Sequence, residues 1–246
     1  NQFKNLVSSN IESSTQRVTY PVLSRIVNDE KRLSYAYQKL SKMTFYLTSV
    51  LLSLLIANSR EIVLLLLGDK WSQSISYLQI LCLSGFLYPL QLINVNILKV
   101  MGRSDLYLQN EVIEKIISIP AIIAGAILGM RALLWGIVIN SFLVYIVNTF
   151  YSSRMIKYPL KKRMLDLAAI IAHVIIMICL SLFIGHILGG GYIVSILIKV
   201  LVMLIYVVLS GTIFKLREYY ELRQIICGQL KAISLLRSII NRCCYR

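Results

Sequence analysis

Residues 167–198, LAAIIAHVIIMICLSLFIGHILGGGYIVSILI, contain no Asp, Glu, Lys or Arg. A helix that crosses a membrane needs about 20 apolar residues, so a run of 32 residues is too long for one span and must contain a turn. Gly189–Gly191 supplies that turn, because successive glycines relax the backbone where one helix ends and the next begins. The run therefore predicts two consecutive transmembrane helices.

Long apolar runs recur along the rest of the chain. They cover Met43–Ser59, Trp71–Leu98, Ile116–Met130, Ala132–Ser153 and Val200–Phe214. Hydrophobic residues make up 57% of the sequence and charged residues only 15%, whereas soluble domains carry about one quarter charged residues. A β-barrel is excluded, because barrel strands alternate in hydrophobicity over about ten residues and these runs are continuous.

The fold class expected from these runs is an all-α, polytopic transmembrane helical bundle with about seven spans. The spans are placed near residues 3–27, 43–67, 75–98, 109–130, 132–152, 164–188 and 192–214. Because residue 1 is Asn and no cleavable signal pattern follows, we expect the chain to be a fragment of a longer protein.

Lys and Arg residues separate cleanly between alternate connections. Nineteen of them fall near residues 25–42, 99–103 and 154–163 and in the tail, against three in the opposite connections, Arg60, Lys70 and Arg131. Cytoplasmic loops retain basic residues. We therefore expect a multi-pass membrane protein with its carboxy terminus in the cytoplasm.

The tail, residues 215–246, spaces apolar side chains between Lys and Arg, as in an amphipathic helix on an anionic membrane surface. A partner-binding tail is the alternative. The net charge of +15 follows the loops and the tail rather than a soluble basic domain, so nucleic acid is not an expected partner. No cysteine or histidine spacing predicts a metal site, and no motif predicts a catalytic set or a bound cofactor.

The first span is the least apolar. Asn5, Ser9, Glu12, Gln16 and Thr19 recur at helical spacing and share one face. Exposing these polar groups to lipid would cost free energy. The face therefore predicts either the wall of a water-filled, substrate-binding cavity or a structural contact with another part of the protein. Arg17 points away from Glu12, toward either a substrate phosphate or a neighbouring helix.

The span near 75–98 also has a polar face, formed by Ser84, Tyr88, Gln91 and Asn94, with Pro89 in its middle. A kinked helix is expected there. Amide and aromatic side chains suit a sugar, but they also join neighbouring helices by hydrogen bonds. Both interpretations stay open for Tyr88, Gln91 and Asn94.

Charged residues in other spans favour structural roles. Glu111 and Lys115, with Glu114 beside them, predict an ion pair near the membrane surface. Lys199 is expected to extend its side chain outward to the membrane surface, with a transport role as the alternative. Gly125-x-x-x-Gly129 permits close approach of two helices.

Several stretches occur in an order that resembles Wzx-type polysaccharide flippases. They are Tyr20-Pro-Val-Leu-Ser-Arg25, Leu64-Leu-Leu-Leu-Gly-Asp-Lys-Trp71, Leu78-Gln-Ile-Leu81, Gly85-Phe-Leu-Tyr-Pro-Leu-Gln91, Asn94-Val-Asn-Ile-Leu98 and Gly102-Arg-Ser-Asp105. The resemblance covers roughly residues 1–158 and is closest to the lipopolysaccharide and teichuronic acid exporter branch.

The resemblance implies a two-lobed bundle in the multidrug, oligosaccharidyl-lipid and polysaccharide exporter superfamily, with alternating access to a central cavity. Residues 1–152 would belong to the second lobe, 153–214 would form two additional helices, and 215–246 would form the cytoplasmic tail. The missing amino-terminal lobe is then an expected partner, and the polar faces of residues 5–19 and 84–94 would line the cavity.

The function expected is translocation of lipid-linked oligosaccharide or polysaccharide precursors, with an undecaprenyl-diphosphate-linked oligosaccharide and membrane lipid as partners. The alternative is a drug or metabolite antiporter of the same superfamily. Such an antiporter needs an acidic cation site within its helices, and Glu12 alone gives little support for one. A cation gradient is the candidate driving force. A membrane enzyme is disfavoured, because the external connections are too short to hold a catalytic domain.

Overall fold

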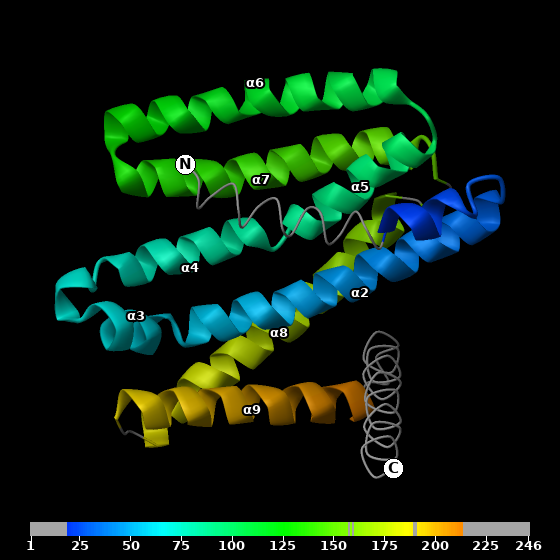
Figure 1. The fold of residues 1–246 in the computed structure, drawn as a ribbon. Helices are drawn as coiled ribbons and strands as arrows, with labels where there is room; N and C mark the ends of the chain where they lie inside the picture. The colour runs from blue at the N-terminus through cyan, green and yellow to red at the C-terminus, as the bar shows by residue number, and fades with distance from the viewer. Residues whose placement is uncertain (1–18, 157, 159, 189–190, 214–246) are drawn as a thin grey trace, which may run out of the picture. The chain divides into compact units, whose positions relative to one another are not determined.

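The computed structural model describes residues 19–156, 158, 160–188 and 191–213, and within these it contains helices and no strand (Figure 1). The chain divides into two compact units, Asn1–Met203 and Leu204–Arg246. The described helices are α2 (Glu30–Ala57), α3 (Ser59–Leu67), the 3-10 helix η1 (Asp69–Trp71), α4 (Ser74–Gly85), α5 (Tyr88–Val100), α6 (Ser104–Leu128), α7 (Met130–Ser153), α8 (Leu160–Leu188) and α9 (Tyr192–Ile213). The expected all-α bundle is confirmed.

Helix α2 starts thirteen residues earlier than the span predicted near 43–67 and ends ten residues sooner. Asp29 caps its start, since the carboxylate accepts a 3.0 Å hydrogen bond from the Arg32 backbone N–H. At its other end, the Asn58 amide donates to the Leu54 carbonyl at 2.8 Å. The chain then continues as the separate helix α3. The expected loop at 28–42 is therefore largely helical.

The span predicted near 75–98 consists of two helices rather than one kinked helix. Helix α4 ends at Gly85 and α5 begins at Tyr88, with Pro89 in its first turn. Proline is tolerated there because the first N–H groups of a helix have no intrahelical partner. The kink expected at Pro89 is therefore a break between two helices, with the proline in the first turn of the second.

Helices α6 and α7 form a tight antiparallel hairpin. Gly129 ends α6 with a φ of +86°, a backbone conformation that favours glycine. A Cβ at Gly125 would lie 2.7 Å from the Leu133 Cβ, and one at Gly136 would lie 2.9 Å from the Ala121 Cβ. Close approach at Gly125 is confirmed, whereas Gly129 serves the turn.

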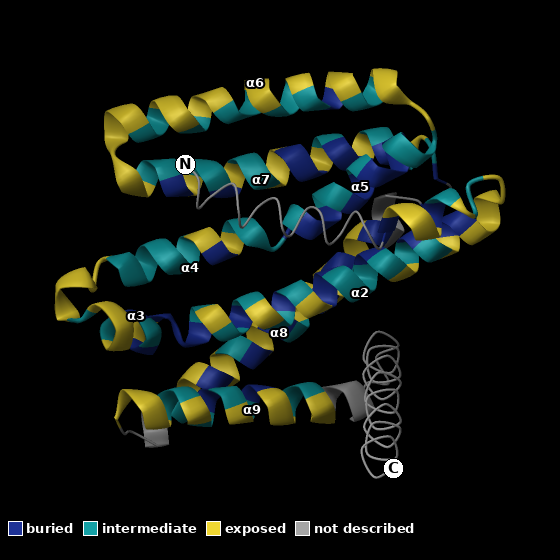
Figure 2. Ribbon diagram, viewed as in Figure 1, coloured by how far each residue is buried: buried dark blue, intermediate teal, exposed yellow. Residues whose placement is uncertain are grey.

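Helices α4 and α5 lie between α7 and α2 in the first unit (Figure 1). Helix α7 packs against α4, α5 and α6, while α2 packs against α4, α5 and α8. Figure 2 shows buried residues gathered where α2, α5 and α7 face one another, while α6 and α9 are largely exposed. Exposed isoleucines on α6, such as Ile116 and Ile127, form an outer surface suited to lipid.

Alternate connections of the chain meet at one end of the first unit. The start of α2, the α5–α6 turn and the α7–α8 connection share an end, while α3, η1 and the α6–α7 turn lie at the other (Figure 1). Seven buried residues join the first three segments: Leu23, Leu33, Tyr37, Ile93, Ile97, Ile156 and Tyr158. These segments carry the basic residues, so we call this the basic end.

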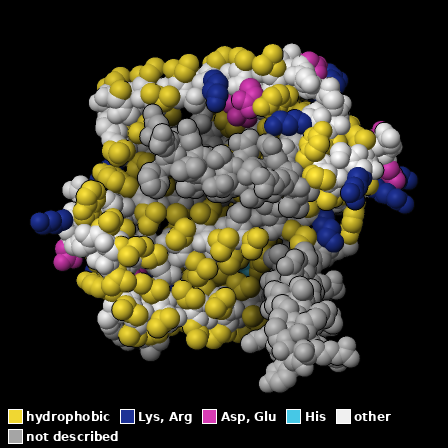
Figure 3. Space-filling model, viewed as in Figure 1, with side chains coloured by type: hydrophobic (Ala, Val, Ile, Leu, Met, Phe, Trp, Pro, Cys, Tyr) yellow, Lys and Arg dark blue, Asp and Glu magenta, His cyan; other side chains and the backbone are white. Residues whose placement is uncertain are grey.

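Among the residues that the structure describes, five helical segments are long and apolar enough to cross a membrane. They are Glu30–Ala57, Ser74–Val100, Met130–Ser153, Arg163–Gly185 and Tyr192–Leu209. Helix α6 is 25 residues long but carries Glu111, Glu114 and Lys115. Hydrophobic side chains cover much of the described surface in Figure 3, with Lys and Arg mainly toward the basic end at the right. The chain is a multi-pass membrane protein.

Candidate functional site

Five of the predicted cavity residues, Asn5, Ser9, Glu12, Gln16 and Arg17, lie outside the described residues. Their assignment stays a prediction. Of the same polar face, Thr19 is described and is buried, at 4% exposure. The basic tail at 215–246 also lies outside the described residues.

Asn94 on α5 is the centre of a buried hydrogen-bond network. Its side-chain oxygen accepts hydrogen bonds from the Tyr37 hydroxyl on α2 and from the Ser152 hydroxyl on α7, the second at 3.0 Å. Its amide nitrogen donates to the Thr149 Oγ1 at 3.3 Å. Asn94 is 1% exposed. One amide thus connects three helices inside the bundle.

Arg163 extends this network to the start of α8. Its Nη1 donates a 3.2 Å hydrogen bond to the Ser152 hydroxyl. The guanidinium lies over the rings of Tyr37 and Tyr158, at 4.8 Å and 5.3 Å from their centres, which is the range of cation–π attraction. Arg163 is only 4% exposed, and its Nε and Nη2 atoms are buried without a hydrogen-bond partner. A buried cation therefore lies at the basic end of the bundle.

A carboxylate completes the surroundings of Arg163. Asp166 accepts a hydrogen bond from the Tyr158 hydroxyl at 2.5 Å and forms a 2.9 Å ion pair with Lys42 on α2. Burial raises the pKa of Tyr158, and the hydrogen bond to Asp166 raises it further, so the phenol stays protonated and keeps donating. These contacts fasten the α7–α8 connection to α2.

The other members of the predicted α4–α5 polar face lie in different environments. The Gln91 amide donates to the Ser141 carbonyl on α7 at 2.8 Å. Tyr88 is half-buried at the start of α5, and the Ser84 hydroxyl bonds to the Leu81 carbonyl of its own helix. Gln91 and Asn94 thus make the interhelical contacts of one interpretation. The assignment of Tyr88, Gln91 and Asn94 to a substrate cavity stays a prediction.

A second polar cluster joins α6 to α7. The amides of Asn110 and Asn148 each donate to the Glu114 Oε1 at 2.9 Å, and Asn110 also donates to Asn148. Asn110 is fully buried, and its side-chain oxygen has no hydrogen-bond partner. Carboxylate and amide oxygens are the ligands that hard cations prefer. The described residues contain no group of three or more His, Cys, Asp or Glu side chains suited to a metal ion.

Sequence reasoning missed most members of both networks. Tyr37 and Arg163 fall in segments that were predicted as loops, so nothing in the pattern indicated their burial. Asn110 and Glu114 stand at i and i+4, a spacing that could have paired them. Asn148 and Thr149 are consecutive on α7, and periodicity alone could not show that they serve different neighbours.

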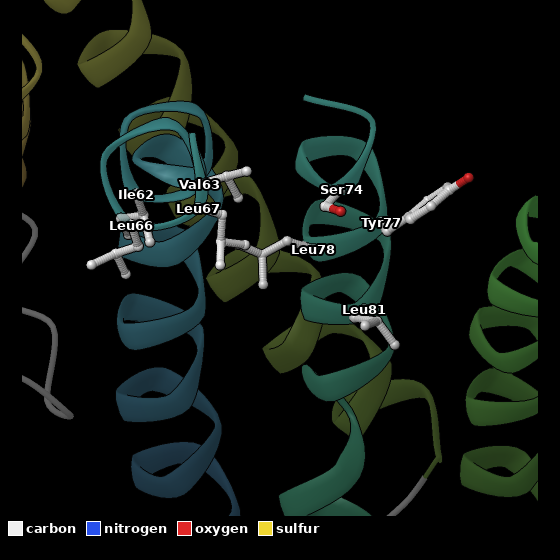
Figure 4. A pocket seen from close by; sticks show the side chains of 8 residues that line it. All are labelled: Ile62, Val63, Leu66, Leu67, Ser74, Tyr77, Leu78 and Leu81. Carbon is white, nitrogen blue, oxygen red and sulfur yellow. The ribbon is translucent and has the colours of Figure 1, made fainter. Parts of the chain in front are cut away.

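At the end opposite the basic end, α3 and α4 enclose an apolar groove of about 360 Å³ (Figure 4). Its lining residues share an aliphatic or weakly polar character and include no charged side chain: Ile62, Val63, Leu66, Leu67, Ser74, Tyr77, Leu78 and Leu81. Such a lining accommodates hydrocarbon rather than a sugar or a phosphate.

Matches to known proteins agree with the resemblance that the sequence motifs carry. A family model described as "Polysaccharide biosynthesis protein" matches residues 1–76. The lipopolysaccharide biosynthesis protein WzxC of Escherichia coli strain K12 is 30% identical over 136 residues, which is 55% of this chain and 27% of WzxC. A protein from Klebsiella pneumoniae, "Uncharacterized membrane protein in cps region", is 28% identical over 114 residues, 46% of this chain and 24% of that protein. The chain spans about a quarter of these relatives.

The fold has a counterpart among solved structures. The lipid II flippase MurJ in its inward closed conformation superimposes with a TM-score of 0.56 at 21% identity. The match covers 80% of this chain and 42% of that structure. The sequence resemblance is therefore confirmed, since this chain is similar to the lipopolysaccharide biosynthesis protein WzxC, and its fold is like that of part of the MurJ structure.

Proposed function

We propose that the protein to which this chain belongs translocates a lipid-linked oligosaccharide or polysaccharide precursor across the bacterial cytoplasmic membrane by alternating access. The observation that carries this proposal is the match to a lipopolysaccharide biosynthesis protein on a chain whose fold matches that of a lipid II flippase. An undecaprenyl-diphosphate-linked oligosaccharide is the proposed substrate. The first lobe of the transporter is the proposed partner of this bundle.

The charge distribution supports a diphosphate-bearing substrate. The basic end carries Arg25, Lys31, Arg32, Lys99 and Arg103 among the described residues. Facing the cytoplasm, it would attract the diphosphate of a lipid-linked precursor, since surface potentials raise the local concentration of opposite charge. In the same proposal, the polar faces of residues 5–19 and 84–94 belong to the walls of the cavity that receives the sugar.

Coupling to a cation gradient belongs to the same proposal. The Asn110, Glu114 and Asn148 cluster places one carboxylate and two amides together between α6 and α7. Carboxylate and amide oxygens are chemically suited to a hard cation. Binding there would reach α5 through Thr149, which accepts a hydrogen bond from Asn94. This cluster is a better candidate for the coupling site than Glu12 alone.

Deletion of the encoding gene in its native host tests the proposed function. We expect lipid-linked precursor to accumulate in the inner leaflet and surface polysaccharide to disappear, with both restored by the complete gene. Loss of drug resistance with normal surface polysaccharide would instead support the antiporter. Accumulation of unpolymerised oligosaccharide in the outer leaflet would contradict translocation and indicate a later step.

A further inference from the structure

A buried ion pair lies outside both networks, at the end opposite the basic end. Lys199 on α9 donates hydrogen bonds from its Nζ to the Glu61 carboxylate at 2.5 Å and to the Ala57 carbonyl at 3.0 Å. The side chains of Lys199 and Glu61 are 7% and 10% exposed. The expectation that Lys199 extends to the membrane surface is therefore wrong. Its partners on α2 and α3 draw the ammonium group inward.

Helix α8 leaves a passage for the lysine side chain at Gly185. A Cβ at this position would lie 2.6 Å from the Lys199 Cε and 3.1 Å from its Cγ. Real Cβ atoms do not approach so closely, so any larger residue would force the lysine out of its path. Gly185 thus lets the α9 side chain pass α8 to reach α3.

Polar groups contact both charges of the pair: a carbonyl oxygen accepts from the lysine, and a hydroxyl donates to the carboxylate. Ala57 is the last residue of α2, where carbonyl groups lack intrahelical partners and the helix dipole favours a cation. Ser195, one turn before Lys199 on α9, donates a 3.1 Å hydrogen bond to the same Glu61 oxygen. Helices α2, α3 and α9 therefore contribute directly to the pair. Two residues before Glu61, Ser59 accepts a 2.8 Å hydrogen bond from Gln79, which joins α3 to α4.

Buried ion pairs are weak sources of stability, because desolvation of both charges offsets their attraction. They discriminate strongly between arrangements, because a shift that separates the partners leaves two charges unpaired in a low-dielectric interior. Here a rotation or a one-turn slide of α9 would leave Lys199 facing lipid or apolar side chains. The docking position in the structure pairs the two charges through Glu61 Oε1.

We infer that the Glu61–Lys199 pair is a docking clasp, which selects the position at which the α8–α9 pair sits against α2 and α3, with Gly185 as the passage that permits it. This inference does not rest on the proposed transport activity. It assigns a role to the carboxy-terminal helix pair: a docked part of the bundle, held in a single register by charge.

Distance measurement by electron paramagnetic resonance tests the clasp in the complete protein in lipid nanodiscs. Spin labels at Leu55→Cys on α2 and Leu197→Cys on α9, both exposed side chains, would report the docking position in a background without native cysteines. We expect one narrow distance distribution in the parent. Lys199→Met, Glu61→Gln and Gly185→Ala should each broaden or shift it.

Two double variants separate a clasp from general stabilisation. The exchange Glu61→Lys with Lys199→Glu should restore the narrow distribution, and Glu61→Leu with Lys199→Met should keep protein abundance but leave the distribution broad. Gly191→Ala is the matched glycine control, because a Cβ there would have no neighbour within 4 Å. A narrow, unshifted distribution in the apolar double variant, or failure of the exchange to restore it, would overturn the inference.

Discussion

The Asn148 amide on α7 donates a 2.9 Å hydrogen bond to the Glu114 carboxylate on α6. The next residue, Thr149, accepts from Asn94 on α5. Two adjacent residues therefore connect the outer helix of the hairpin to the central network. Within an apolar bundle such hydrogen bonds fix the neighbours of each helix, because every unpaired polar group there is costly.

Replacement of Asn148 by Leu should weaken the α6–α7 hairpin. It removes one of the two amides that bond Glu114 and leaves that carboxylate oxygen underpaired, at a cost of roughly 1–3 kcal/mol. The free energy of unfolding in detergent measures the loss. Ser118→Leu on α6 is the control, because its exposed hydroxyl bonds only to its own helix. Equal stability of the two variants would contradict the account of this cluster.

A methyl group at Gly125 should also destabilise the hairpin. Alanine there would place its Cβ 2.7 Å from the Leu133 Cβ, and overpacking of this kind costs about 1–3 kcal/mol. Gly85→Ala is the matched variant, because its nearest neighbour would be the end of Leu52 at 3.4 Å. Thermal unfolding should separate the two. A melting temperature as low for Gly85→Ala as for Gly125→Ala would show that the contact at Leu133 is not the cause.

Asn94→Leu should lower the abundance of the protein more than Gln91→Leu. Asn94 is almost fully buried and has three side-chain partners, whereas half-buried Gln91 has one carbonyl partner. Each buried group left unpaired costs about 1–3 kcal/mol. Export of polysaccharide, divided by protein level, tests the cavity prediction separately. Normal export per molecule in both variants would remove Gln91 and Asn94 from the substrate site.

The two ends of the bundle should differ in their access from outside the cell. In a protein without native cysteines, Lys70→Cys in η1 should react with an impermeant thiol reagent added to intact cells. Ser104→Cys at the basic end should react only after the membrane is opened. The reverse pattern would place the basic end outside and invert the predicted orientation.

The spans and the alternation of their connections were readable from the sequence because both depend on composition. Uncharged runs must be buried in lipid, and basic residues must stay out of it. The break between α4 and α5 was readable for a similar reason, since Pro89 acts locally. The end of α2 at Ala57 was not, because Asn58 is a single polar residue whose capping role depends on the local backbone.

The polar contacts were only partly readable. The spacing of Gln91 and Asn94 showed that they share a face, but not which helix that face meets. Lys199 and Glu61 are 138 residues apart, and no local pattern links them. Arg163 belongs to a basic segment that reads as solvent-exposed, and its burial follows from the packing of Tyr37 and Tyr158 around it. Pairings of this kind are fixed by tertiary structure alone.

Transbilayer movement of a labelled precursor tests the central claim most directly. The complete protein is reconstituted into liposomes that carry a fluorescent undecaprenyl-diphosphate-linked oligosaccharide in both leaflets, and an impermeant reagent then destroys the label on the outside. With an active flippase the inner-leaflet pool moves outward during the assay, so the account predicts that the protected fraction falls well below that of protein-free liposomes. A protected fraction equal to that of protein-free liposomes, with folded protein present and a cation gradient applied in either direction, would contradict it.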